Sequence, residues 1–142
     1  MRGKALTMTN LTLAEANGRL AGFHSKTYEV ELDLVGDGGL ILCAGDGVGT
    51  RAGIGDGRIF IDRSNSGQTG FHPDFAGRHE AVGQGPLRVL VDRSSVEMFA
   101  GDGELVISDR IFPAAENDGL QLFGTAGARV RSLKVWELKA AF

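Results

Sequence analysis

The sequence has little cysteine or proline and no long apolar run. Its 142 residues include one cysteine and three prolines. The single cysteine, Cys43, excludes a disulfide within the chain. No apolar stretch approaches the roughly 20 residues that a membrane-spanning helix needs, and the N-terminal segment MRGKALTMTNLTLAEANG lacks the apolar core of a signal peptide. We therefore expect no membrane partner and no leader in this chain, which leaves its localisation unassigned.

Basic clusters are also missing. The net charge is −3 at pH 7 and the pI is about 5.6. Proteins that bind nucleic acids usually concentrate lysine and arginine on one surface. The charge pattern therefore predicts no nucleic-acid partner.

Glycine, with 22 residues, is abundant. It occurs in stretches such as VGDGG and AGDGVG between short apolar runs, and Asp-Gly pairs in this setting favour β-hairpins. Residues 27–35, TYEVELDLV, alternate apolar and polar side chains, which is typical of a half-buried strand. Further strands are expected at residues 39–44, 58–63, 87–93, 95–100, 104–112, 119–124 and 128–138. No segment keeps a helical period for three turns, so the pattern predicts one all-β domain, an antiparallel sandwich or barrel.

The stretch VDRSSVEMF places charged residues inside strand-forming sequence. Charges in a strand cost free energy unless they are paired, solvated or bound to a ligand. A two-residue turn at Ser94 and Ser95 would put Asp92 opposite Glu97, and a following turn at GDG would put Asp109 on the same sheet face. Such a face needs a cation, carboxyl groups that stay protonated, or hydrogen-bonding partners such as sugar hydroxyls.

Three Asp-Arg pairs lie at the ends of apolar strands: Asp62–Arg63, Asp92–Arg93 and Asp109–Arg110. Neighbours in a strand point to opposite faces, so each pair sends a carboxylate one way and a guanidinium the other. Such residues can form surface ion pairs, each contributing about 0 to 1 kcal/mol. They can also bind vicinal hydroxyl groups, because arginine donates hydrogen bonds and a carboxylate accepts them. Both interpretations stay open at this point.

Several stretches of the sequence resemble, in consistent order, one known family. They are RIFIDRSNSG, FHPDFAGRHEA, LRVLVDRSSVEMFAGDGELVISDRIFP, GLQLFG and ARVRSLKVWEL. Together they are similar to the C-terminal β-sandwich of glycoside hydrolase family 32, which comprises invertases, levanases and inulinases. The resemblance spans residues 26–138 and leaves residues 1–25 unassigned. It implies an all-β, two-sheet antiparallel sandwich of the concanavalin or lectin-like jelly-roll kind, as one domain over residues 1–142.

The same resemblance implies that this chain alone is not an enzyme. Family members place a nucleophilic aspartate, an Arg-Asp-Pro motif and a Glu-Cys motif on a five-bladed propeller that precedes the sandwich. This sequence contains no Asn-Asp-Pro-Asn-Gly, Arg-Asp-Pro or Glu-Cys. We therefore assign no catalytic residue and expect a non-catalytic accessory domain, and we leave open whether its parent enzyme is secreted.

Two functions remain open for such a domain. Related sandwiches are fructan-binding modules that bind terminal fructosyl units, so the expected ligands are levan, inulin or sucrose-type sugars. The candidate sugar-binding residues, chosen by chemistry and position, are Asp62, Arg63, Asp92, Arg93 and Glu97. The alternative is a purely structural domain that packs on the catalytic propeller or mediates oligomerisation, with no ligand of its own.

No residue pattern specifies a cofactor or a metal. His72 and His79 occur in the stretch FHPDFAGRH without further histidine or cysteine ligands, which indicates a loop rather than a metal site. The stretch AGDGVGTRAGIGDG lacks the alternating oxygen ligands of an EF-hand. A calcium ion in a concanavalin-like sandwich is left open. Cys43 is expected to be a small core residue.

Overall fold

A computed structural model describes residues 2–45, 48–55, 57–62, 78–82, 86–92, 95–101, 105–110 and 118–138. Side chains are described for these residues except 2–4, 48, 78–82 and 105–110. No helix in these segments is long and apolar enough to cross a membrane.

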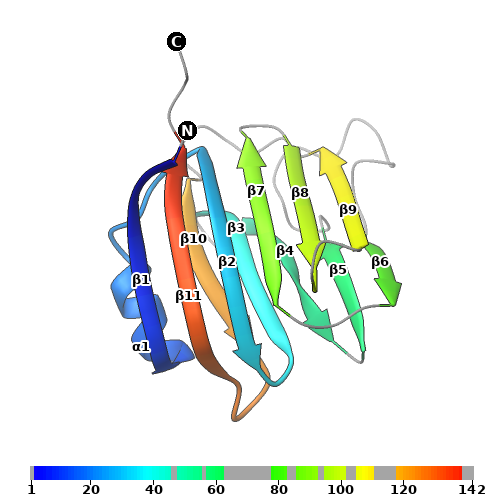
Figure 1. The fold of residues 1–142 in the computed structure, drawn as a ribbon, viewed down its shortest axis with the longest axis horizontal. Helices are drawn as coiled ribbons and strands as arrows, with labels where there is room; N and C mark the ends of the chain where they lie inside the picture. The colour runs from blue at the N-terminus through cyan, green and yellow to red at the C-terminus, as the bar shows by residue number, and fades with distance from the viewer. Residues whose placement is uncertain are drawn as a thin grey trace.

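Two antiparallel sheets stack face to face (Figure 1). Within the described residues, sheet A has six strands in the order β1-β11-β2-β7-β8-β9, and sheet B has five in the order β10-β3-β4-β5-β6. The strands of sheet A are β1 (Arg2–Thr12), β11 (Arg129–Leu138), β2 (Thr27–Val35), β7 (Leu87–Asp92), β8 (Ser95–Ala100) and β9 (Leu105–Arg110). The strands of sheet B are β10 (Gly119–Gly124), β3 (Gly38–Gly45), β4 (Val48–Gly55), β5 (Arg58–Asp62) and β6 (Arg78–Val82). The predicted all-β, two-sheet antiparallel sandwich is therefore confirmed.

Apolar side chains that alternate along the strands fill the space between the sheets. In β2, Tyr28, Val30 and Leu32 are buried, as the alternation in the sequence predicts. Burying one large aliphatic side chain stabilises a fold by about 1.5 to 3 kcal/mol. The largest fully buried side chains are Tyr28, Met8, Leu20, Leu32, Leu40, Leu42, Ile59, Ile61, Met98, Leu120 and Leu133. They come from both sheets and from the helix, so one continuous core joins these elements.

Helix α1, Leu13–Leu20, was not predicted from the sequence. It begins after Thr12, whose hydroxyl accepts the Glu15 backbone N–H at 3.1 Å, while the Glu15 carboxylate accepts the Thr12 backbone N–H at 3.1 Å. This capping box stabilises the first turn, and the hydrogen bond from the Thr12 backbone lowers the pKa of Glu15. The helix has only eight residues, so its period does not stand out from the surrounding strand sequence.

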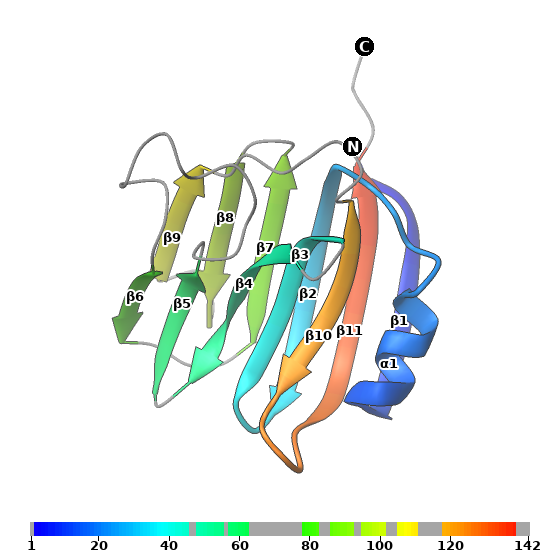
Figure 2. The same cartoon turned by 180° about the vertical axis from the view of Figure 1, so that it is seen from behind.

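The same helix lies beside β10, an edge strand of sheet B (Figure 2). The Asn17 amide donates to the Leu122 carbonyl oxygen at 3.0 Å and accepts the Leu122 backbone N–H at 2.7 Å. An edge strand otherwise leaves such backbone groups without a partner. Asn17 therefore satisfies the backbone groups of Leu122 at the outer edge of sheet B in the way that a neighbouring strand would.

Two strands of sheet B also differ from the prediction. β4 lies in glycine-rich sequence in which no strand was expected. A Cβ at Gly39 of β3 or Gly53 of β4 would overlap the backbone of the facing strand, so this close approach requires glycine. β6 contains His79, whose backbone pairs with Ile61, so the loop predicted at His79 is wrong. The other histidine of that stretch, His72, lies outside the described residues.

Candidate functional site

The β7–β8 hairpin carries the charged stretch, and its register differs from the predicted one. Asp92 pairs with Ser95 and Leu90 pairs with Glu97, so the connection begins one residue earlier than expected. The predicted turn at Ser94 and Ser95 is therefore wrong, consistent with the weak preference of a serine pair for tight hairpin turns. The cross-strand partners shift by two residues, which keeps each side chain on its predicted face.

The third acid predicted on this face, Asp109, is out of register with Glu97. Glu97 pairs with Ser108 of β9, and Val96 pairs with Asp109. Side chains alternate along a strand, so a shift of one residue moves a whole set of positions to the opposite face. Asp109 consequently lies opposite Val96, which is fully buried, and the predicted three-acid face is wrong.

Asp92 and Glu97 do share the outer face of sheet A. Both are exposed, whereas Val91 and Val96 beside them are fully buried. They are diagonal neighbours across the hairpin, a relation that separates side chains by roughly 7–8 Å. Among the described residues, neither carboxylate has a hydrogen bond or an ion pair. As far as the described residues go, both carboxylates are available to a ligand.

Asp62, a further sequence candidate, lies on the other sheet. It ends β5 and alternates with the buried Ile61, which places it on the outer face of sheet B. The outer faces of two stacked sheets point in opposite directions, so Asp62 does not join Asp92 and Glu97. The two remaining candidates, which lie outside the described residues, are Arg63 and Arg93.

A buried ion pair lies next to the two carboxylates and was missed from the sequence. Glu29 of β2 is on the outer face of sheet A, yet its side chain is only 4% exposed. Arg88 Nε of β7 donates to Glu29 Oε2 at 2.6 Å, and the Arg88 side chain is 47% exposed. The two residues are 59 positions apart, so no local pattern in the sequence could have indicated the pair.

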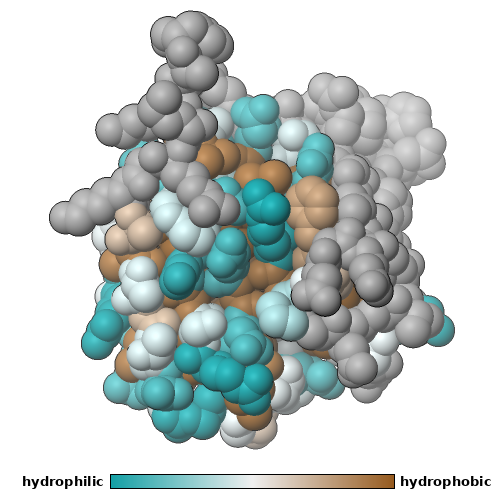
Figure 3. Space-filling view, viewed as in Figure 1, coloured by the Kyte–Doolittle hydropathy of each residue, from teal (hydrophilic) through white to brown (hydrophobic). Residues whose placement is uncertain are grey.

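Aromatic and apolar side chains surround this ion pair. Glu29 pairs in register with Trp136 of β11 on one side and with Leu90 on the other. The Arg88 guanidinium carbon lies 5.6 Å from the centre of the Phe99 ring, which is within cation–π range. Figure 3 shows this face with hydrophilic and hydrophobic side chains interleaved rather than gathered into one apolar patch. The surface thus combines hydrogen-bonding groups with apolar ones.

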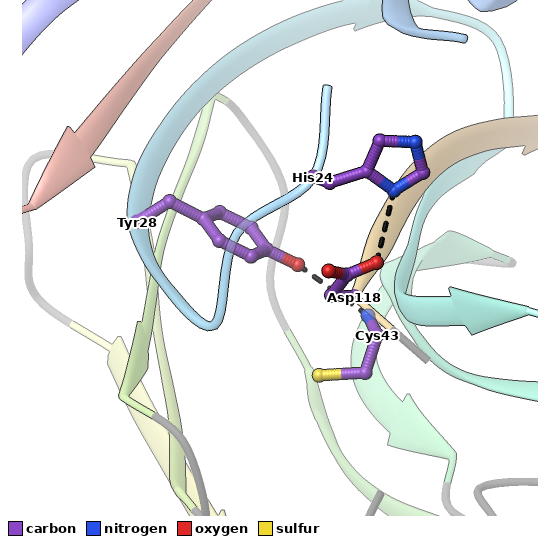
Figure 4. A network of polar contacts seen from close by, with 4 residues as sticks. All are labelled: His24, Tyr28, Cys43 and Asp118. Carbon is purple, nitrogen blue, oxygen red and sulfur yellow. Dashed lines mark hydrogen bonds and ion pairs between the residues drawn. The ribbon is translucent and has the colours of Figure 1, made fainter. Parts of the chain in front are cut away.

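A second polar cluster lies where β2 and β3 meet the start of β10 (Figure 4). His24 Nδ1 lies 2.9 Å from Asp118 Oδ1, and the Cys43 backbone N–H donates to the Tyr28 hydroxyl at 3.4 Å. Cys43 has a positive φ of 52° at an irregularity in β3. The Tyr28 hydroxyl therefore contacts, from sheet A, a backbone N–H of sheet B.

The two buried acids of this cluster stay protonated at neutral pH. Burial raises the pKa of the Cys43 thiol to about 11. Burial also raises the pKa of the Tyr28 hydroxyl, and the nearby Cys43 adds to this effect. Cys43 is only 4% exposed, and the thiolate is the reactive form of cysteine. The thiol is a core residue, as predicted, and the cluster has a structural role.

Metal ligands do not gather in the described part of the chain. No group of three or more histidine, cysteine, aspartate or glutamate side chains there is arranged to hold a metal ion. The expectation of no cofactor, with calcium left open, therefore stays a prediction to be tested in solution.

Comparison with known proteins identifies the domain. The family model described as "Glycosyl hydrolases family 32 C terminal" matches residues 1–137. Levanase of Bacillus subtilis (strain 168) is 34% identical over 155 residues, covering 98% of this chain and 23% of the levanase. Levanase of Bacillus sp. (strain L7) is 38% identical over 135 residues, covering 84% of this chain and 15% of that protein. The chain therefore spans less than a quarter of the length of these two relatives.

Solved structures show the same fold. The crystal structure of exo-inulinase from Aspergillus awamori superposes with a TM-score of 0.76 at 23% identity, over 100% of this chain and 29% of the inulinase chain. Fold and sequence together define a β-sandwich domain of glycoside hydrolases. The chain belongs to glycoside hydrolase family 32 and corresponds to its C-terminal domain. The predicted resemblance is confirmed, and the chain corresponds to the C-terminal domain of these glycoside hydrolases, not to their catalytic part.

Proposed function

We propose that this domain is a carbohydrate-binding accessory domain of a β-fructosidase and binds terminal fructosyl units of levan, inulin or sucrose-type sugars. Two relatives of the chain are named levanases, which supports a fructan as the ligand. That the whole protein is a β-fructosidase is part of the same proposal.

The observation that carries this proposal is the pair of exposed carboxylates on the outer face of β7 and β8. Asp92 and Glu97 lie on neighbouring strands beside the half-buried Leu90, and neither carboxylate has a partner among the described residues. Sugar hydroxyls donate hydrogen bonds to carboxylates, and small-molecule sites combine a few such polar groups with apolar contacts. This combination suits a hydroxylated ring with an apolar face.

The proposal is tested by isothermal titration calorimetry of the chain with levan, inulin, sucrose and fructose, with cello-oligosaccharides as the control sugar. We expect saturable heat with fructans and none with cello-oligosaccharides. The double variant Asp92→Ala/Glu97→Ala should lose this heat while its free energy of unfolding changes by less than about 0.5 kcal/mol, because both residues are exposed. Glu137→Ala, at another exposed position of sheet A, is the matched control. A folded double variant with wild-type affinity would exclude these carboxylates as the site.

A structural role is the second candidate. The chain covers only 15–23% of the two levanases, so in such proteins a much larger part of the polypeptide is available to pack against the domain. A domain of this kind can pack on a catalytic propeller or mediate oligomerisation. A stable dimer of the isolated chain in light scattering, together with no heat from any sugar, would favour this role over sugar binding.

A further inference from the structure

Arg88 is fixed by contacts on two sides. Its Nε donates to the carboxylate of Glu29 at 2.6 Å, and its guanidinium lies over the Phe99 ring at 5.6 Å. The Glu29 side chain is only 4% exposed, whereas that of Arg88 is 47% exposed. Among the described residues, no partner binds the two terminal nitrogens of Arg88. With respect to the part of the chain that the structure describes, four N–H donors of an ordered guanidinium are thus available to a ligand.

A fixed arginine differs from an ordinary surface arginine. Arg131 Nη1 lies 3.3 Å from Asp33 Oδ2. The Arg131 side chain is 63% exposed and that of Asp33 is 28% exposed, so each is more exposed than its counterpart in the Arg88–Glu29 pair. A mobile arginine loses side-chain entropy when it binds a ligand. Arg88 is already ordered by a buried carboxylate and an aromatic ring, so it loses less. An ordered guanidinium of this kind favours ligand binding, and a solvated ion pair does not provide one.

The position of Arg88 brings donors and acceptors onto one strip of surface. Arg88 pairs with Phe99, the next outward pair is Leu90 with Glu97, and the following one begins with Asp92. Arg88 therefore lies at one end of the strip and Asp92 at the other, with Leu90 between them and Glu97 beside Leu90. A hydroxyl group both donates and accepts hydrogen bonds, so it can contact either end.

The charge of the strip favours a neutral ligand. Among the described residues of the strip, the Arg88 charge is balanced by Glu29, and the two exposed carboxylates, Asp92 and Glu97, add negative charge. Like charge disfavours binding of an anion at such a surface. A phosphate or a carboxylate is therefore a poor fit, and a neutral polyhydroxylated unit is a good one.

We propose that Arg88, positioned by Glu29 and Phe99, is the hydroxyl-binding donor of a fructosyl site on the outer face of β7 and β8, with Asp92 and Glu97 as its acceptors. This inference rests on the proposed fructan binding and adds to it a donor that the sequence did not indicate. Glu29 is a positioning residue in this site because it acts through Arg88.

The test measures levan affinity by calorimetry for the wild-type chain, Arg88→Lys and the control Arg131→Lys. A lysine keeps a positive charge beside Glu29, but its single ammonium cannot pair with Glu29 and also present a planar fork of donors. We expect Arg88→Lys to weaken levan binding by at least about tenfold. Arg131→Lys should bind within about twofold of wild type, because an exposed ion pair contributes little. Unfolding temperatures of all three proteins establish that they are folded.

Glu29→Gln tests the positioning role. Glutamine keeps an oxygen that accepts from Arg88 Nε but removes the charge, so affinity should fall less than in Arg88→Lys. If Arg88→Lys does not fold, the double variant Arg88→Gln/Glu29→Gln, which buries no charge at this pair, should show the same loss of levan affinity.

The outcomes separate the two proposals. A folded Arg88→Lys variant with wild-type affinity overturns the role of Arg88 while fructan binding stands. No levan heat from the wild-type chain overturns both proposals. If the wild-type chain binds inorganic phosphate in place of levan, and Arg88→Lys loses this binding, the proposal of a neutral ligand is overturned.

Discussion

The outer faces of the two sheets each carry an arginine over a phenylalanine ring. On sheet A, Arg88 lies 5.6 Å from the centre of Phe99, and on sheet B, Arg51 lies 4.9 Å from the centre of Phe123. Arg88 is also paired with a buried carboxylate. Within the described residues, Arg51 has no ion pair. The same arginine–aromatic contact therefore occurs beside a buried carboxylate on sheet A and without a described ion pair on sheet B.

Sheet B instead surrounds its arginine with aromatic packing. The Phe123 ring meets the Phe60 ring at 6.2 Å, and Phe60 is only 6% exposed although it lies on an outer face. This difference indicates that an arginine–aromatic contact alone does not mark a site. The combination on sheet A, with ordered donors and acceptors that have no partner among the described residues, is what distinguishes it.

The largest expected difference is in stability. Arg88→Met should lower the free energy of unfolding by about 3 kcal/mol, because it leaves the buried Glu29 carboxylate without its guanidinium. Arg51→Met should cost less than about 1 kcal/mol, the usual contribution of an exposed cation–π contact. Urea unfolding of both variants measures the two values. Equal losses would show that the Glu29–Arg88 pair contributes no more to the free energy of unfolding than Arg51 does.

The free energy of unfolding should fall at alkaline pH because of Cys43 and Tyr28, which contact each other between the two sheets. The pKa of Cys43 is raised from 9.0 to about 11 in the folded chain, so between these values the unfolded chain has lost the proton that the folded chain keeps. Stability then falls as pH rises, by about 2 kcal/mol at pH 11 for this group. Tyr28, whose pKa is also raised, adds to the loss above pH 10. Unfolding free energies at pH 8 to 11 measure the decline, and Cys43→Ala should remove its own share. An unchanged pH dependence in Cys43→Ala would contradict this assignment.

The edge of sheet B should be sensitive to a single donor. Asn17→Asp keeps an oxygen for the Leu122 N–H but loses the bond to the Leu122 carbonyl, so we expect a loss of about 1 to 2 kcal/mol. Faster hydrogen exchange at the Leu122 amide should accompany it. Asn10→Asp, at an exposed position of β1, is the control and should be close to neutral. Equal effects of the two substitutions would exclude the edge contact as the cause.

The smallest expected effect is that of metal removal. We predict that thermal unfolding is the same with calcium and with a chelator, because the described residues contain no group of three or more possible metal ligands. A calcium ion that binds only the folded state would raise the unfolding temperature. A chelator-dependent fall would place a calcium ion in the fold.

The sequence predicted the faces of the strands better than their partners. The alternation in β2 correctly places Tyr28 on the inner face, and the common face of Asp92 and Glu97 was also predicted, because the period of two survives a two-residue slip. β4 was missed because its glycines reflect close strand packing, which is a property of the partner strand. The capping box of Thr12 and Glu15 is a local signal that could have indicated α1, and it was missed.

The candidate site was predicted only in part, for a related reason. Glu29 looked like an ordinary exposed position of an amphipathic strand. It is buried because Arg88 and Leu90 of β7 and Trp136 of β11 lie beside it, and these come from distant parts of the chain. Strand order across a sheet is set by long-range packing, which a local pattern does not contain. The acceptors of the site were therefore visible in the sequence and the donor was not.

The most direct measurement is the ¹H–¹⁵N spectrum of the arginine Nε groups during titration with a short levan oligosaccharide, with Arg88→Lys and Arg131→Lys used to assign the two signals. We expect a saturable shift of the Arg88 Nε signal and none of the Arg131 signal. A titration in which the Arg88 signal stays in place, while other signals of the domain move, would place the sugar elsewhere. No movement of any signal would contradict fructan binding itself.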